Sequence, residues 1–156
     1  ACGRPTWIYL EVIRYLIFAI LDFKIYSRNE ARPPHWMGEQ GKTINSLVTE
    51  GCEIEGFVDN CVLSSGVKVC RGAYVKDSVI MSDVVIGEGS VVNYSIIDSD
   101  IKLGKKCVVG RERLESSGVT VISGGMSLPD GTVVEDGAMA DMSYFRNRIT
   151  DISLNS

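Results

Sequence analysis

Five basic residues in the second half of the chain could together bind an anion, because such a site needs several converging cationic donors. The five candidates are Lys102, Lys105, Lys106, Arg111 and Arg113. The three lysines are separated by no more than two residues, and the arginines follow in a short polar stretch. These five residues are therefore the candidates for an anion-binding site, with ordinary surface ion pairing as the alternative.

Residues for catalysis or metal binding are scarce in this sequence. Its one histidine, His35, follows two prolines, where a solvated linker residue is expected. The five cysteines contain no C-x-x-C pair. G-x-G-x-x-G does not occur, and Gly41-Lys42-Thr43 is not a phosphate loop because Trp36 stands where G-x-x-x-x-G-K-S/T requires its first glycine. We therefore expect no catalytic group and no metal site, and we expect reduced cysteines in a cytoplasmic protein.

The elements that position these side chains follow from a repeat of seventeen residues. Three apolar columns recur in one register, and their members are Val58, Val75, Val92 and Val109; Leu63, Ile80 and Ile97; and Val69, Ile86 and Leu103. Steps of five, six and six residues fit neither a helix nor a two-residue alternation. They predict three corners per coil, with short parallel strands stacked about 4.8 Å apart. An ordinary antiparallel sheet is disfavoured because hairpin turn pairs are missing.

A second inward position is predicted four residues after a corner, where less space remains. It holds Val67, Ala73, Val84, Ser90, Ile101 and Cys107. Gly87 and Gly104 directly follow a corner, and we attribute both glycines to a tight turn. The first coil is predicted to begin near Val48, only fifteen residues before Leu63, because terminal coils of a solenoid are atypical.

Two hexapeptides resemble the repeats of the left-handed parallel β-helix: Ile86-Gly-Glu-Gly-Ser-Val and Leu103-Gly-Lys-Lys-Cys-Val. The hand comes from this resemblance, since ordinary parallel crossovers are right-handed. A longer resemblance covers INSLVTEGCEIEGFVDNCVL (44–63), GVKVCRGAYVKDSVIMSDVVIGEGSVVNYSIID (66–98) and GVTVISGGMSLPDGTVVEDGAM (118–139). These three segments are similar in sequence to the C-terminal domain of bacterial glucose-1-phosphate adenylyltransferases, especially those of the second, often weakly catalytic subunit type.

The resemblance implies a regulatory and oligomerisation domain of a nucleotidyltransferase that makes ADP-glucose and pyrophosphate from ATP and glucose 1-phosphate for glycogen biosynthesis. In that family magnesium and ATP bind a separate N-terminal domain, so this chain is expected to be a fragment that is inactive alone and holds no cofactor. The implied partners are its own catalytic domain, other adenylyltransferase subunits in a homo- or hetero-oligomer, and a phosphorylated metabolite bound by the five basic residues. Plant-type members carry an activator lysine after a V-T-V-I stretch, whereas Ser123 stands here.

Other functional classes stay open. The chain could be a non-catalytic assembly subunit of a heteromeric complex, or it could belong to another nucleotide-sugar pyrophosphorylase. A hexapeptide acyltransferase is disfavoured, because those enzymes use a histidine on the coils as general base. Arg71, Glu88 and Lys105 lie seventeen residues apart, and this spacing favours ordinary surface ion pairing over ligand binding.

The solenoid is predicted over residues 46–140, after an apolar helix and a proline-containing linker (1–45) and before a polar tail (141–156). The stretch 7–23 is densely apolar, but Glu11 and Arg14 interrupt it, so no membrane span is expected. We expect self-association instead, because a soluble monomer rarely exposes such a surface. The net charge of −4 and the lack of a basic, aromatic patch argue against nucleic acid as a partner.

Overall fold

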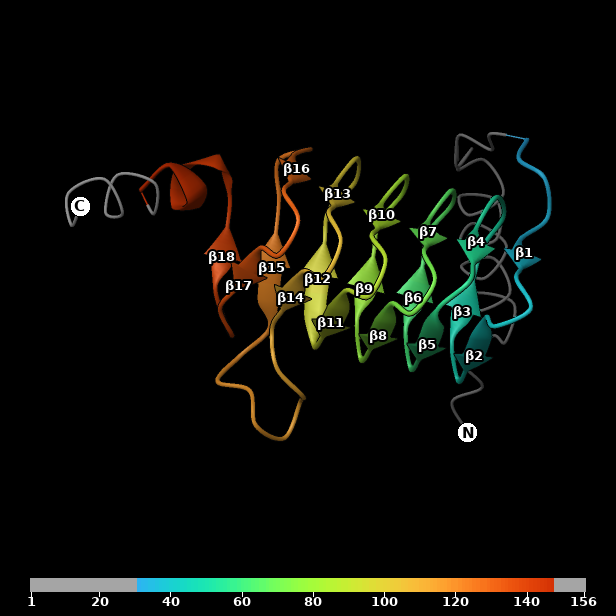
Figure 1. The fold of residues 1–156 in the computed structure, drawn as a ribbon, viewed down its shortest axis with the longest axis horizontal. Helices are drawn as coiled ribbons and strands as arrows, with labels where there is room; N and C mark the ends of the chain where they lie inside the picture. The colour runs from blue at the N-terminus through green and yellow to red at the C-terminus, as the bar shows by residue number, and fades with distance from the viewer. Residues whose placement is uncertain (1–30, 148–156) are drawn as a thin grey trace, which may run out of the picture. The chain divides into compact units, whose positions relative to one another are not determined.

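The computed structural model describes residues 31–147, so the predictions for the apolar stretch 7–23 and for residues 148–156 lie outside the described part. The described chain winds into coils that each contribute one strand to three six-stranded parallel sheets (Figure 1). Sheet A contains β1 (Trp36–Met37), β4 (Glu53–Ile54), β7 (Lys68–Val69), β10 (Val85–Ile86), β13 (Lys102–Leu103) and β16 (Ser127–Leu128). Sheet B contains β2 (Lys42–Ile44), β5 (Phe57–Asp59), β8 (Tyr74–Lys76), β11 (Val91–Asn93), β14 (Val108–Val109) and β17 (Val133–Val134). Sheet C contains β3 (Leu47–Val48), β6 (Val62–Leu63), β9 (Val79–Ile80), β12 (Ser95–Ile97), β15 (Thr120–Ile122) and β18 (Met139–Ala140).

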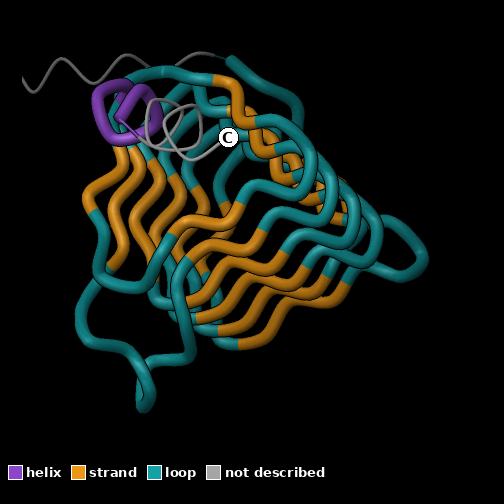
Figure 2. Tube along the Cα trace, turned by 60° about the vertical axis from the view of Figure 1, so that its left-hand side comes forward, coloured by secondary structure: helices purple, strands orange, loops and turns teal. Residues whose placement is uncertain are grey.

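The three sheets are the faces of a triangular prism, and the strands of successive coils stack in parallel on each face (Figure 2). This arrangement confirms the predicted left-handed parallel β-helix. Short strands suffice because each pairs with the coil before it and the coil after it, so the stack satisfies the backbone hydrogen bonds.

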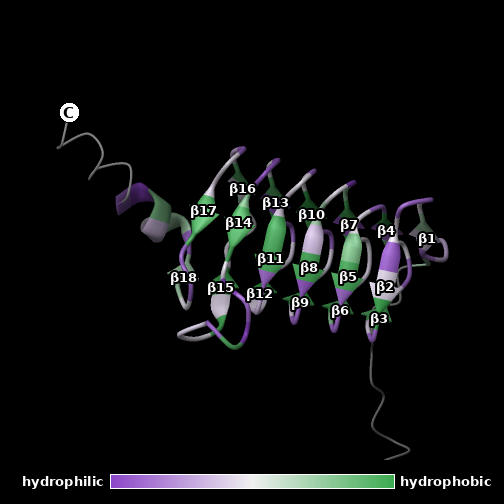
Figure 3. Ribbon diagram, turned by 60° about the horizontal axis from the view of Figure 1, so that its bottom comes forward, coloured by the Kyte–Doolittle hydropathy of each residue, from purple (hydrophilic) through white to green (hydrophobic). Residues whose placement is uncertain are grey.

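The seventeen-residue register is confirmed in the strand pairing. Val75 pairs with Val92 in sheet B, Ile80 pairs with Ile97 in sheet C, and Ile86 pairs with Leu103 in sheet A. All members of the three predicted columns are buried, as are the six residues predicted for the second inward position. The colouring in Figure 3 accordingly places hydrophobic residues along many of the strands and hydrophilic residues at many of the corners.

The corner between sheets B and C is built from a residue with positive φ followed by a small side chain, a hydroxyl at Ser78 and a thiol at Cys61. Asn60 and Asp77 have positive φ values of 54° and 49°, which asparagine and aspartate tolerate better than other non-glycine residues. One residue later, the Ser78 hydroxyl donates to the Lys76 carbonyl (2.7 Å) and accepts from the Ser95 N–H of the next coil (3.2 Å). The hydroxyl therefore satisfies two backbone groups inside a corner that no water reaches.

The solenoid begins earlier than predicted. Trp36 pairs with Glu53 and Thr43 pairs with Val58, so β1 and β2 form a first coil inside the stretch predicted as linker. The boundary predicted at residue 46 is wrong here, because this coil carries Met37 and Thr43 where later coils carry buried aliphatic residues, and the apolar columns therefore do not reveal it.

The shortened coil is the second one, not the first. Between sheets A and B, the first coil has four corner residues (38–41) and the third has four (70–73), but the second has only Glu55 and Gly56. The register shows the same loss, since Trp36↔Glu53 spans seventeen residues and Lys42↔Phe57 spans fifteen. A notch therefore opens in this edge of the prism.

Gly87 and Gly104 are required for a reason other than a tight turn. Neither has a positive φ, whereas Gly89 does (68°). A Cβ added at Gly87 would lie 2.2 Å from the Gly104 carbonyl oxygen, and one at Gly104 would lie 2.6 Å from the Asp130 nitrogen. These glycines let the backbones of successive coils approach each other, so the predicted explanation is corrected.

The described part of the tail closes the last coil. Residues 142–147 form a short helix, and the Asp141 carboxylate accepts hydrogen bonds from the Ser143 hydroxyl (2.5 Å) and the Tyr144 N–H (2.8 Å) at its start. These bonds, that from Ser143 first, hold the pKa of Asp141 below its ordinary value. Tyr144 and Phe145 pack against the core and cover the apolar end of the prism.

Candidate functional site

The structure places the five predicted cations in two groups. Lys102 lies on the outer face of β13, and Lys105 and Lys106 lie on the corner that follows it. Arg111 and Arg113 lie beyond β14, on the loop that joins sheet B to sheet C, and all five side chains are exposed. The strand β14 separates the two groups along the coil, so they do not form one enclosed anion pocket.

The surface ion pairing expected at a spacing of seventeen residues is present in part. Lys105 Nζ lies 3.5 Å from a carboxylate oxygen of Glu88, seventeen residues earlier. A pair outside the predicted ladder joins Lys68 Nζ to Glu53, fifteen residues earlier on the neighbouring strand of sheet A, at 2.9 Å. Exposed pairs of this kind contribute little to stability, about 0–1 kcal/mol. Arg71, the third member of the predicted ladder, makes no such pair with Glu88 within the described range 31–147.

The loop 110–118 projects from the prism between β14 and β15 (Figure 1). Its base is fixed, because the Ser117 N–H and hydroxyl donate to the Asp136 carboxylate at 2.7 and 2.9 Å and the Ser116 hydroxyl donates to the same group. The bond from Ser116, followed by those from Ser117, holds the pKa of the Asp136 carboxyl below its ordinary value. The loop thereby presents Leu114, which is 98% exposed, on a fixed base.

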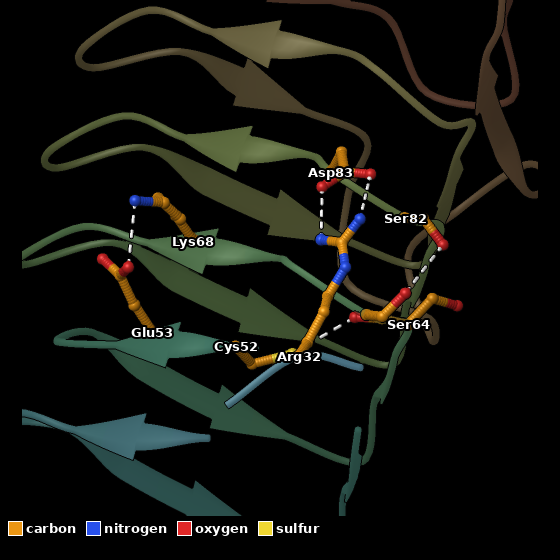
Figure 4. Close-up of polar contacts among 8 residues, drawn as sticks. Arg32, Cys52, Glu53, Ser64, Lys68, Ser82 and Asp83 are labelled. Carbon is orange, nitrogen blue, oxygen red and sulfur yellow. Dashed lines mark hydrogen bonds and ion pairs between the residues drawn. The ribbon is translucent and has the colours of Figure 1, made fainter. Parts of the chain in front are cut away.

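An ion pair between residues far apart in the sequence crosses the edge between sheets C and A (Figure 4). The Arg32 guanidinium donates to both carboxylate oxygens of Asp83, at 2.6 and 2.9 Å, across 51 residues of sequence. Its side chain passes over Gly51 and Gly66, where an added Cβ would lie within 3.0 Å of Arg32 atoms. The sequence does not predict this pair, because neither charge belongs to a periodic column. The pair fixes the path of the chain as it reaches the first coil.

We expect Asp83→Asn to lower the free energy of unfolding by about 1 kcal/mol at neutral pH, because a bidentate but partly exposed ion pair is lost. The Arg32 hydrogen bonds lower the pKa of Asp83 below its ordinary 3.8, so the stabilisation is present above that value and is lost as the pH falls through the lower, folded pKa. Urea unfolding across this pH range measures the effect.

The matched control for this prediction is Asp100→Asn. Asp100 has the same left-handed conformation one coil further on, with a φ of 59° against 58°, and makes no ion pair among the described residues. Equal stability of the two variants at neutral pH would contradict a contribution from the Arg32 pair.

Two faces of the prism carry apolar ladders on the outside. On sheet C the outward residues in register are Leu47, Val62, Val79, Ile96, Val121 and Met139. On sheet B the outward register begins with Lys42 and continues with Phe57, Tyr74, Val91, Val108 and Val133, and the Phe57 and Tyr74 rings stack at 5.1 Å. Asp59 and Lys76 also face outward on this sheet. Leu47 and Met139 are 61% and 73% exposed. Aligned apolar side chains on a solvent face are typical of association surfaces.

The four cysteines of the described residues lie in the solenoid, and His35 lies at its start. Cys52, Cys61 and Cys107 are buried in the core, and Cys70 is half-buried; all four are free thiols. Burial raises the pKa of Cys61 to about 11, so this thiol is unreactive at neutral pH. His35 is exposed directly before β1. Within residues 31–147, no three His, Cys, Asp or Glu side chains are grouped so that they could hold a metal ion, and no helix there is long and apolar enough to span a membrane.

Comparison with known proteins gives a match over most of the solenoid. A family model described as the GlmU-like C-terminal hexapeptide matches residues 34–128. The glucose-1-phosphate adenylyltransferase of Clostridium botulinum (strain Eklund 17B / Type B) is 46% identical over 56 residues, which are 36% of this chain and 14% of that protein. The enzyme of the same name from Thermosipho africanus (strain TCF52B) is 42% identical over 55 residues, which are 35% of this chain and 13% of that protein. This chain therefore spans only a small part of the length of these relatives.

Among solved structures, the acetyltransferase domain of PglB from Neisseria gonorrhoeae FA1090 aligns with a TM-score of 0.35 and 16% identity, covering 83% of this chain and 58% of that one.

Proposed function

We propose that this chain, which belongs to the GlmU-like C-terminal hexapeptide family, is the regulatory and assembly domain of a glucose-1-phosphate adenylyltransferase. The observation that carries the proposal is the identity of 46% to an enzyme of that name. In the whole protein the reaction joins ATP and glucose 1-phosphate into ADP-glucose and pyrophosphate, for glycogen synthesis in the cytoplasm. The second, weakly catalytic subunit type is the form to which we assign it.

The outer faces of the prism support an assembly role. Sheets B and C present apolar ladders, whereas sheet A presents Glu53, Lys68 and Lys102 in register on its outer face. The two apolar faces suit contacts with a catalytic domain and with further subunits, and the polar face suits solvent. The partners proposed for them are the chain's own catalytic domain and other adenylyltransferase subunits.

We assign catalysis to a separate catalytic domain of the whole protein. The described residues offer neither a phosphate loop nor a set of metal ligands, so they do not fit magnesium and ATP, which we place in the catalytic domain. The exposed cations Lys105 and Lys106 share one corner and are the part of the predicted cluster to which we assign a phosphorylated effector. For Arg111 and Arg113, which lie on the loop between β14 and β15, we propose contacts with protein partners instead.

Sedimentation velocity of the purified chain tests the assembly role. We expect self-association at high micromolar concentration, and we expect Ile96→Lys, in the middle of the sheet C ladder, to weaken it about tenfold. Val85→Lys on sheet A is the matched control, because it adds the same charge to a polar face between Lys68 and Lys102. A wild-type chain that stays monomeric would contradict the assembly role.

The enzymatic part of the proposal has a separate test. The full-length parent protein should form ADP-glucose from ATP and glucose 1-phosphate, and this chain alone should form none above a buffer control. A parent that assembles normally but has no activity would instead support the non-catalytic assembly subunit. A parent that uses another nucleotide or sugar phosphate would support a different nucleotide-sugar pyrophosphorylase.

A further inference from the structure

The two-residue loss in the second coil creates a small cavity that no role described above uses. It lies at the edge between sheets A and B, where the corners of the first and third coils project past the short corner at Glu55 and Gly56. Its volume is about 260 Å³, and its lining residues are Trp36, Gly38, Glu39, Gln40, Glu55 and Arg71. This size lies just below the usual range of about 300–1,000 Å³ for small-molecule sites and admits one small ring.

An exposed indole forms the apolar part of this cavity. Trp36 lies on β1 and is 53% exposed. A Cβ added at Gly38 would lie 3.3 Å from Trp36 Cη2 and 3.1 Å from Glu55 Cγ, so the bare glycine leaves room between the indole and the carboxylate-bearing chain. An exposed tryptophan beside an open hollow offers a flat apolar surface to a ligand ring.

The polar groups around the indole have no partners in the described part of the chain. The carboxylates of Glu39 and Glu55, the carboxamide of Gln40 and the guanidinium of Arg71 make no hydrogen bond or ion pair with any residue from 31 to 147. Glu55 is nevertheless half-buried, so its carboxylate has lost part of its hydration without a protein donor in return. Glu39, Gln40 and Arg71 are exposed and can bond water, so the lost hydrogen bonds are those of Glu55. A ligand that donates to the Glu55 carboxylate would restore them.

The charges and hydrogen-bonding groups that line the cavity indicate which class of ligand it can bind. Two carboxylates beside one guanidinium give a net negative site, which repels phosphate and other anions. An entirely apolar ligand would leave four polar groups desolvated and unpaired. A neutral polyhydroxylated ring satisfies all of them, because its hydroxyls donate to the carboxylates and accept from Gln40 and Arg71 while its C–H face packs on the indole.

We propose that this cavity binds one neutral hexose ring, either free or at the end of an oligosaccharide. The proposal does not depend on the proposed function, since it rests on the geometry and the unpaired groups of the second coil alone. The small volume and the open position of the site imply weak binding, with a dissociation constant in the millimolar range.

Tryptophan fluorescence of the whole chain tests the proposal. The chain has two tryptophans, and Trp7→Phe leaves Trp36 as the only indole reporter. We expect glucose and maltotriose to shift its emission saturably. Equal affinity for the two would indicate a free ring, and tighter binding of maltotriose would indicate an oligosaccharide end.

Single-residue variants test whether sugar binding depends on the cavity residues while the fold stays intact. In titrations by isothermal calorimetry, Trp36→Ala and Glu55→Gln should each weaken binding about tenfold or more. Glu88→Gln, on the corresponding corner two coils further on, should bind as the unaltered chain does, and circular dichroism should be the same for all. No saturable response to either sugar, an unchanged affinity in Trp36→Ala, or saturation by inorganic phosphate or tetramethylammonium in place of the sugars would overturn the proposal.

Discussion

Replacing Ile86 with aspartate is expected to lower the free energy of unfolding by at least about 4 kcal/mol, enough to prevent cooperative folding of a marginally stable solenoid. Ile86 is fully buried in the middle of sheet A, between Val69 and Leu103 of the adjacent coils. A carboxylate there would displace apolar contacts and would find no cation or free donor inside the prism, so its desolvation would go uncompensated. Thermal and urea unfolding followed by circular dichroism measure the loss.

Val85→Asp is the matched control, because it places the same group on the same strand but on the outer face. Val85 pairs with Lys68 on one side and Lys102 on the other, so an aspartate at this position would lie between two cations. We expect its stability to stay within about 0.5 kcal/mol of the unaltered chain. Similar losses in the two variants would show that the inward and outward assignment of β10 is wrong.

The interior of the prism could be predicted because it repeats. The central coils each place an aliphatic side chain at the same three points, so the spacing alone predicts that Val92, Ile97 and Leu103 are buried. The outer residues obey no such rule, since solvent accepts almost any side chain. This difference explains why the core could be predicted in detail while the five proposed anion ligands were not resolved into two groups.

Residue spacing alone does not locate the shortened corner that forms the notch. The interval of fifteen between Val48 and Leu63 reveals that two residues are missing, but three corners separate these positions and the sequence does not say which one is short. Only the pairing of β1 with β4 and of β2 with β5 assigns the loss to Glu55 and Gly56. The cavity beside Trp36 depends on that assignment.

The sequence carries a signal for the corners between sheets B and C. Asn45, Asn60 and Asp77 precede Ser46, Cys61 and Ser78 at intervals of fifteen and seventeen, and each of the first three adopts a positive φ. Asparagine or aspartate followed by a small residue would have marked the corner between sheets B and C in each of these coils. Tyr94 follows the same backbone path without the favourable side chain, so residue type alone would have missed it.

Gly87→Ala is expected to destabilise the solenoid by about 3 kcal/mol or more, although it adds a single methyl group. The new Cβ would lie 2.2 Å from the Gly104 carbonyl oxygen and 2.7 Å from the Leu103 carbonyl oxygen. Both obstacles are backbone atoms of the next coil, which are held by the Gly87 N–H to Leu103 carbonyl bond at 3.0 Å. Relief therefore requires the two coils to separate, which would weaken the ladder hydrogen bonds at this edge.

Gly89→Ala distinguishes this steric cause from the general cost of replacing a corner glycine. Gly89 has a φ of 68°, but a Cβ there would meet nothing closer than Lys106 Cγ at 3.6 Å. Its substitution should cost only the strain of a left-handed alanine, about 1 kcal/mol. Urea unfolding of both variants measures the difference, and a Gly89→Ala loss as large as that of Gly87→Ala would mean that backbone conformation, and not the approach of successive coils, explains the glycine at position 87.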